Sequence, residues 1–149
     1  MQQEDLDKLI RYLKKVLTIS TENYIYFKQV IAICKKTPDN EDLLAFLERL
    51  KESNDNIYFV ANNFYEECIK LKGCNLTEST GKSLVVAKRR LHLQLMRFDE
   101  DKQPLLNNQY FKENIESKTT DDSFFKALKT SQKELREMVK SKRESLNVD

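Results

Sequence analysis

Two apolar seams, each with the spacing of a long packed helix, constrain the fold of this chain more than any other feature. The first seam advances in alternating steps of four and three residues, which is the spacing of a heptad repeat. Its members are Leu6, Ile10, Leu13, Leu17, Ser20, Tyr24, Phe27, Ile31 and Cys34. The pattern predicts one helix from about Glu4 to Lys35. Pro38 then disfavours helical geometry in the residue before it, and Asp39 offers a cap for the next helix.

The second seam repeats this spacing and ends near Gly73, a candidate left-handed cap. Its members are Leu43, Leu47, Leu50, Asn54, Ile57, Ala61, Phe64, Cys68 and Leu71. If the chain folds back at Pro38, the two seams match in antiparallel register, so that Leu6 faces Cys68 and Phe27 faces Leu47. The sequence therefore predicts a long antiparallel helical hairpin.

The same register places the one polar member of each seam at the same depth, Ser20 opposite Asn54. A buried polar layer can fix the register of paired helices, as a single core asparagine does in coiled coils. The alternative is that two small polar residues fall at similar depths without any such role.

The first helix has more apolar surface than a two-helix hairpin covers, so further helices must pack on it, from this chain or from another. The surplus forms one stripe of Leu9, Val16 and Val30 and a second stripe of Tyr12, Ile19, Tyr26 and Ile33. A third helix is expected from caps at Thr77 to Thr80 to about Phe98, in a central position. Its predicted inward face comprises Leu84, Ala87, Leu91, Leu95 and Phe98, widened by Val85, Val86, Leu93 and Met96.

A polar connection over 99–120 is expected to be irregular and to dock one short helix. A fourth main helix is predicted from Asp121 and Asp122 to about Leu146, since acidic residues suit a helix N-terminus. Its expected inward residues are Phe124, Phe125, Leu128, Leu135, Met138 and Val139.

These elements predict an all-α protein, a helical bundle of about four main helices in a single domain over 1–149. Residues 1–75 form the hairpin, and 76–149 supply two further helices joined by the irregular connection. The low content of turn residues, with two Gly and two Pro, fits long helices better than a β-fold. Three cysteines without a CxxC pair, and no signal-peptide pattern, favour a cytoplasmic location. Every apolar stretch is interrupted by charge, so membrane insertion is not expected.

The sequence offers no recognisable catalytic, metal or cofactor site. His92 is the one histidine, which excludes paired-histidine metal and acid–base sites. Gly81-Lys82-Ser83 resembles the end of a phosphate-binding loop but lacks the preceding glycine and strand. We therefore expect a non-enzymatic protein without a cofactor.

The sharpest surface feature is a basic stripe on the last helix, with alternating steps of three and four residues. It comprises Lys126, Lys129, Lys133, Arg136, Lys140 and Arg143. A second basic group on the third helix comprises Lys82, Lys88, Arg89, Arg90 and Arg97. Ion pairs within the helix to Glu137 and Glu144 offer the alternative that the stripe is a solvated face.

The leading hypothesis is a protein–protein interaction module, such as an adaptor, an assembly subunit or an inhibitor or immunity-type binding protein. It rests on the surplus apolar stripes and the absence of catalytic groups. The alternative is a nucleic-acid-binding accessory protein that uses the basic stripe. A third hypothesis is homo-oligomer formation through Tyr12, Ile19, Tyr26 and Ile33. The net charge of +2 is too balanced to indicate a polyanion partner by bulk attraction.

Overall fold

The chain is an all-α helical bundle, as its seams predict. The computed structural model describes residues 2–119 and 124–146, without the side chains of residues 124–126. The four long helices are α1 (Gln3–Lys35), α2 (Glu41–Lys70), α3 (Glu78–Asp101) and α6 (Phe124–Leu146). Between α3 and α6 lie α4 (Gln103–Leu106), α5 (Gln109–Asn114) and the 3-10 helix η1 (Glu116–Lys118). No strand occurs in the described ranges.

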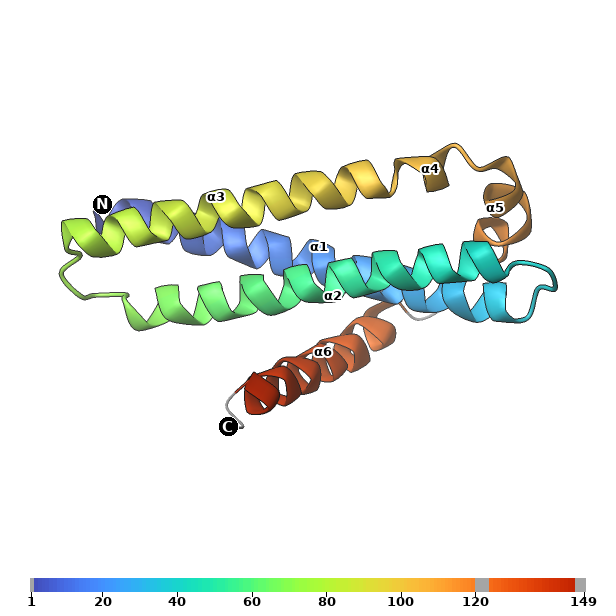
Figure 1. The fold of residues 1–149 in the computed structure, drawn as a ribbon. Helices are drawn as coiled ribbons and strands as arrows, with labels where there is room; N and C mark the ends of the chain where they lie inside the picture. Colours follow the sequence, from blue (N-terminus) through green and yellow to red (C-terminus); the bar gives the residue numbers. More distant parts are fainter. Residues whose placement is uncertain (1, 120–123, 147–149) are drawn as a thin grey trace.

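Helices α1 and α2 form the predicted antiparallel hairpin and run side by side along the molecule (Figure 1). Many of their seam residues are buried, and Leu6, Leu13, Leu47, Ala61 and Cys68 are fully so. Each buried aliphatic side chain removes apolar surface from water, which is the main favourable term in the packing of such helices. The hairpin therefore forms the core on which the other helices pack.

The polar layer of the hairpin is hydrogen-bonded, as the register predicts. Asn54 and Ser20 are both buried, and the Asn54 Nδ2 atom donates to the Ser20 backbone carbonyl oxygen over 2.9 Å. Asn23 Nδ2 in turn donates to Asn54 Oδ1 over 3.4 Å. Because a buried amide without a partner is costly, this bond favours the one register that places Asn54 beside Ser20.

The turns at the two ends of α2 differ in how well the sequence predicts them. Gly73 has φ of 80°, the left-handed conformation expected of it. The expectation that Asp39 caps α2 was wrong. Asp39 itself has φ of 63°, and Asn40 is the residue that precedes the helix. The Asn40 side chain makes no capping bond and instead donates to the Tyr110 hydroxyl over 2.9 Å.

Helix α3 lies along one edge of the hairpin, so the central position predicted for it was wrong (Figure 1). Thr77 caps its first turn, since its hydroxyl accepts from the Thr80 backbone N–H. Only Gly81, Leu84, Leu91 and Phe98 are buried on this helix. The four residues expected to widen the buried face, Val85, Val86, Leu93 and Met96, are exposed instead. Ala87 and Leu95, partly buried, also pack against the core, so the main inward face predicted for α3 is confirmed but the wider face is not.

The connection after α3 contains three short helices, α4, α5 and η1, where one short helix was expected. Leu105, Phe111 and Ile115 are buried in the main core, which explains why α4, α5 and η1 hold to the end of the hairpin. Tyr26 on α1 donates its hydroxyl to Glu116 over 2.5 Å, and burial raises the pKa of this phenol. The connection therefore covers apolar surface that α3 leaves open at the end of α1.

Helix α6 crosses the hairpin at an angle, on the side away from α3 (Figure 1). Leu135 and Val139 are buried with Tyr58 in a second, smaller apolar cluster, and Met138 packs against it. The inward positions of Leu135, Met138 and Val139 are thus confirmed. The predicted helix start at Asp121 and Asp122, and the side chains of Phe124 and Phe125, lie outside the described residues. None of the helices in the described ranges is both long and apolar enough to traverse a bilayer.

Candidate functional site

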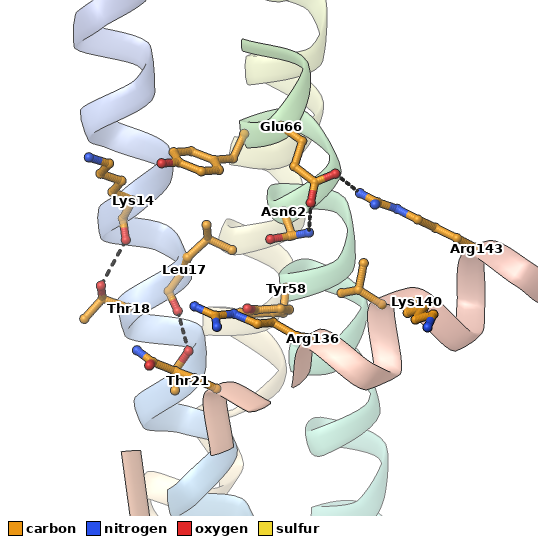
Figure 2. A pocket seen from close by; sticks show the side chains of 13 residues that line it. Lys14, Leu17, Thr18, Thr21, Tyr58, Asn62, Glu66, Arg136, Lys140 and Arg143 are labelled. Atoms are coloured by element: carbon orange, nitrogen blue, oxygen red, sulfur yellow. Dashed lines mark hydrogen bonds and ion pairs between the residues drawn. The ribbon is translucent and has the colours of Figure 1, made fainter. Parts of the chain in front are cut away.

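A cleft of about 560 Å³ lies where α6 crosses the hairpin, and it brings part of the predicted basic stripe together with residues of α1 and α2. Four cationic side chains line it, Lys14 from α1 and Arg136, Lys140 and Arg143 from α6. Leu17 and Tyr58 contribute apolar surface to the cleft (Figure 2), and Val139 of α6 also lines it. The cleft thus has apolar surface among its positively charged side chains.

Among the residues that the structure describes, Arg143 is the one cation of the cleft with an acidic partner. Its guanidinium forms an ion pair with Glu66 over 2.5 Å and donates through Nε to the Asn63 side-chain oxygen over 2.8 Å. Asn62 donates to the other Glu66 oxygen over 3.2 Å, which fixes the carboxylate against α2 (Figure 2). Arg143 therefore fastens the C-terminal part of α6 to the hairpin.

The remaining cations of the cleft have no acidic partner within ion-pair distance among the described residues: Lys14, Arg136 and Lys140. Among the described residues, Glu137 and Glu144 form no ion pair with the basic residues of α6, so the structure does not support the alternative that they neutralise the stripe. Because Lys14, Arg136 and Lys140 have no acidic partner in the described part of the chain, the cleft carries uncompensated positive charge. All three are exposed, so solvent screens their mutual repulsion.

Tyr58 places a hydroxyl group in the cleft that makes no hydrogen bond to the described residues, although the side chain is only 5% exposed. Burial raises the pKa of this phenol, and the charge of Arg136 opposes that shift. The phenol is therefore neutral at ordinary pH and keeps its proton to donate. A nearly buried donor beside an unpaired guanidinium is an arrangement that suits an anionic acceptor such as a carboxylate.

The hydroxyls of the α1 wall are turned toward their own helix. Thr18 Oγ1 donates to the Lys14 carbonyl over 3.0 Å, and Thr21 Oγ1 donates to the Leu17 carbonyl over 2.8 Å (Figure 2). Their protons are used within the helix, so these hydroxyls serve as acceptors toward the cleft. The donors available to a bound group include the three unpaired cations, the Tyr58 and Tyr65 hydroxyls and the Gln132 amide.

The rest of the basic stripe lies beyond the cleft. Lys129 and Lys133 are exposed on α6 but do not line it, and the side chain of Lys126 is outside the described residues. The positive surface therefore continues along α6 past the cleft.

The second basic group is carried by α3, and all its members, Lys82, Lys88, Arg89, Arg90 and Arg97, are exposed. Lys82 pairs with Glu78 over 3.3 Å, and the Lys88 ammonium lies 5.3 Å from the centre of the Tyr12 ring on α1. Between α3 and α6, α1 carries Lys8, Arg11, Lys14 and Lys15 with no acidic residue from position 8 to 21. The two predicted basic sets are thus linked across α1.

The apolar stripe proposed as a packing or partner surface is mostly covered within the chain. Tyr12, Tyr26 and Ile33 pack against the main core, whereas Ile19 is exposed. One exposed isoleucine gives little apolar area for self-association through this stripe.

Sequence reasoning did not identify Lys14 and Tyr58 as site residues. Tyr58 follows a seam residue directly, so its position in the sequence indicates a core residue and not a site residue. For Lys14, the available signal was the run of basic residues in α1 without an acidic residue among them. Metal binding by His, Cys, Asp or Glu finds no support in the described ranges, where no group of three such residues is assembled.

The docking of α6 that forms the cleft is supported by a second polar contact on α1. Glu134 accepts from the Tyr24 hydroxyl over 2.7 Å and from Lys28 Nζ over 2.9 Å. The bond from Lys28, followed by the bond from Tyr24, holds the pKa of Glu134 below its ordinary value of 4.5. These bonds position the N-terminal half of α6 as Arg143 positions its C-terminal half.

Glu134→Gln tests this contact through its pH dependence. A carboxyl whose pKa is lower in the folded state stabilises the fold above its unfolded pKa and loses that effect as the pH falls through its folded pKa. Since the Glu134 side chain is 34% exposed, we expect the variant to unfold about 0.2–1 kcal/mol more easily at pH 7. Urea denaturation at pH 7 and at a pH well below 4.5 should show that difference vanishing on acidification. Glu137→Gln, at an exposed position of the same helix, is the control and should show no comparable effect.

Comparison of the chain with protein-family models, with curated proteins and with solved structures finds no match.

Proposed function

We propose that this chain is a non-enzymatic protein-interaction module that binds an acidic segment of a partner protein in the cleft between α1, α2 and α6. The observation that carries the proposal is that Lys14, Arg136 and Lys140, all without acidic partners among the described residues, line the same cleft as the Tyr58 hydroxyl, which makes no hydrogen bond to those residues. Carboxylates of the segment would accept from these donors, with charge assistance.

The composition of the cleft favours a protein segment over nucleic acid. Leu17 and Val139 offer apolar surface to a side chain lying between two acids, as in the apolar centre and charged rim of protein interfaces. No aromatic residue lies between Lys129 and Lys133, so nucleic-acid bases would find no ring to stack on there.

Nucleic acid is the second candidate, because the basic side chains of α3, α1 and α6 are linked across one side of the molecule. Such a surface would contact phosphates over a longer path than the cleft alone. This candidate predicts that cations outside the cleft matter as much as those within it.

The test compares two double variants of α6 with the same change of charge. Arg136→Glu with Lys140→Glu alters the cleft, and Lys129→Glu with Lys133→Glu alters the stripe beyond it. The probe is a labelled synthetic peptide with glutamates around leucine, and fluorescence anisotropy measures its binding. We expect the cleft variant to weaken binding by at least about tenfold, whereas the control changes it by less than about threefold.

Two results would overturn the proposal. One is equal loss of peptide binding in the two double variants, which would mean that general charge and not the cleft binds the peptide. The other is binding of DNA or RNA oligonucleotides but not of the peptide, with an affinity that falls linearly on a log–log plot against salt, which would establish the second candidate. A peptide with glutamine in place of glutamate should not bind the unaltered protein.

A further inference from the structure

The outward face of α3 carries large apolar side chains that nothing in the described structure covers. Val85, Val86, Leu93 and Met96 are between 46% and 58% exposed. They lie on the side of the helix opposite the buried Leu84, Leu91 and Phe98. A groove of about 800 Å³ between α3 and α1 adjoins Val85 and Val86 and has Leu9 and Leu84 in its floor. Contiguous exposed apolar surface with a charged rim marks an interaction site.

The spacing of this face is that of a helix-pairing seam. Lys82, Val86, Arg89, Leu93, Met96 and Glu100 follow one another in steps of four and three residues. This is the same alternation that joins α1 to α2, but it is displayed toward solvent. A helix laid along α3 would therefore meet a continuous line of side chains over several turns.

The charges of this face specify the chemistry of the partner. No acidic residue occurs between Glu78 and Asp99, and Arg90 and Arg97 flank the seam on one side. Lys82 and Arg89 lie on the seam itself, in line with Val86 and Leu93. Lys82 pairs with Glu78 of its own helix at the surface, so a partner carboxylate would share or replace that exposed ion pair. A partner helix can place a carboxylate opposite each of these cations and an apolar residue opposite each aliphatic side chain.

The same interleaving argues against a lipid surface as the occupant. Helices that lie on a bilayer separate an apolar face from a basic one, so that their cations remain among the headgroups. On α3, Arg89 lies between Val86 and Leu93. If those two side chains contacted the acyl chains, the Arg89 side chain would be placed at the same depth in the bilayer, away from the headgroups. A second copy of α3 is a poorer fit as well, because antiparallel pairing that brings Val86 against Met96 also brings Arg90 near its own copy.

We infer that α3 is a docking site for an amphipathic helix of another protein, with carboxylates at two seam positions seven residues apart and aliphatic residues at the others. The seam of that helix reads acid, apolar, acid, apolar, apolar and base against Lys82, Val86, Arg89, Leu93, Met96 and Glu100. This surface is separate from the cleft of α6, and the two can be occupied independently.

A synthetic helix of about three heptads with this seam, made in both chain directions and labelled for anisotropy, tests the inference. We expect one direction to bind the full-length protein. Leu93→Asp should weaken that binding by at least about tenfold, because it buries an unpaired carboxylate in the interface. Leu93 is 58% exposed, so circular dichroism should find the variant folded. Ser83→Asp, an exposed change of equal charge outside the seam, is the matched control and should have a small effect.

A charge exchange makes the register testable. Lys82→Glu should weaken binding of the peptide, and a peptide with lysine at the facing position should bind this variant better than it binds the unaltered protein. Arg136→Glu with Lys140→Glu should leave α3 binding unchanged, so failure of the cleft proposal is distinguishable. The inference is overturned if neither peptide direction binds, if Leu93→Asp binds as well as the unaltered protein, or if phosphatidylserine vesicles bind the α3 face and the peptides do not.

Discussion

Replacing Phe27 by alanine is expected to lower the free energy of unfolding by about 3–5 kcal/mol, the range for removing a buried phenylalanine. Phe27 is only 2% exposed and lies where α1, α2 and α3 meet. Its ring packs edge-to-face against Phe98 of α3, with 6.1 Å between the ring centres and 86° between the planes. The substitution would therefore leave a cavity shared by three helices. Urea denaturation followed by circular dichroism measures the loss.

The matched control is Leu93→Ala, which removes an exposed apolar side chain from α3 and should change stability by no more than about 0.5 kcal/mol. A double-mutant cycle of Phe27→Ala and Phe98→Ala isolates the ring contact, and we expect a coupling of about 0.5–1.5 kcal/mol. A loss below about 1 kcal/mol for Phe27→Ala, with no coupling to Phe98, would contradict the packing of α3 on the hairpin.

The hairpin could be predicted from sequence because its information is local and repeated. A seam with an unbroken heptad spacing specifies both the helix and the face it buries, and two such seams joined by a short turn leave one antiparallel register. The pairing of Ser20 with Asn54 followed from that register alone. The structure adds the particular bond, from the Asn54 amide to the Ser20 carbonyl.

The position of α3 could not be predicted in the same way. Apolar residues lie on several sides of this helix, and sequence alone does not say how many neighbours are present to cover them. The structure gives α3 one neighbouring face, and Leu84, Leu91 and Phe98 fill it. Val86 and Leu93 remain outside, which turned an expected part of the core into a candidate surface.

The cleft depends on an angle that no local pattern specifies. The basic stripe of α6 is visible in the sequence, but the residues it meets depend on how Leu135 and Val139 dock against Tyr58. That docking brings Arg136 and Lys140 beside Lys14 and takes Arg143 to Glu66. The basic residues of α6 could therefore be predicted from the sequence, whereas the residues of α1 and α2 that complete the site could not, because tertiary packing brings them to the cleft.

Because α6 is held on the hairpin by a small apolar cluster, one substitution in that cluster should release α6 from the hairpin. Leu135 is fully buried and, with Val139, forms the buried apolar contact with the hairpin in the part of α6 whose side chains the structure describes. Leu135→Asp would bury a carboxylate without a partner, at a cost of several kcal/mol, which exceeds what so small a cluster contributes. We expect α6 to separate while α1, α2 and α3 stay packed, because their larger core does not include Leu135.

Hydrogen exchange with mass spectrometry checks this expectation helix by helix. Backbone amides of α6 should lose protection in Leu135→Asp, whereas those at the centres of α1 and α2 keep it. Ser141→Asp, an exposed change of equal charge on α6, should leave both patterns as they are. The variant should also lose the acidic peptide from the cleft yet retain the helical peptide on α3, since only the cleft needs α6. If all helices lose protection together, α6 is integral to the fold, and the cleft and the α3 face cannot act as independent surfaces.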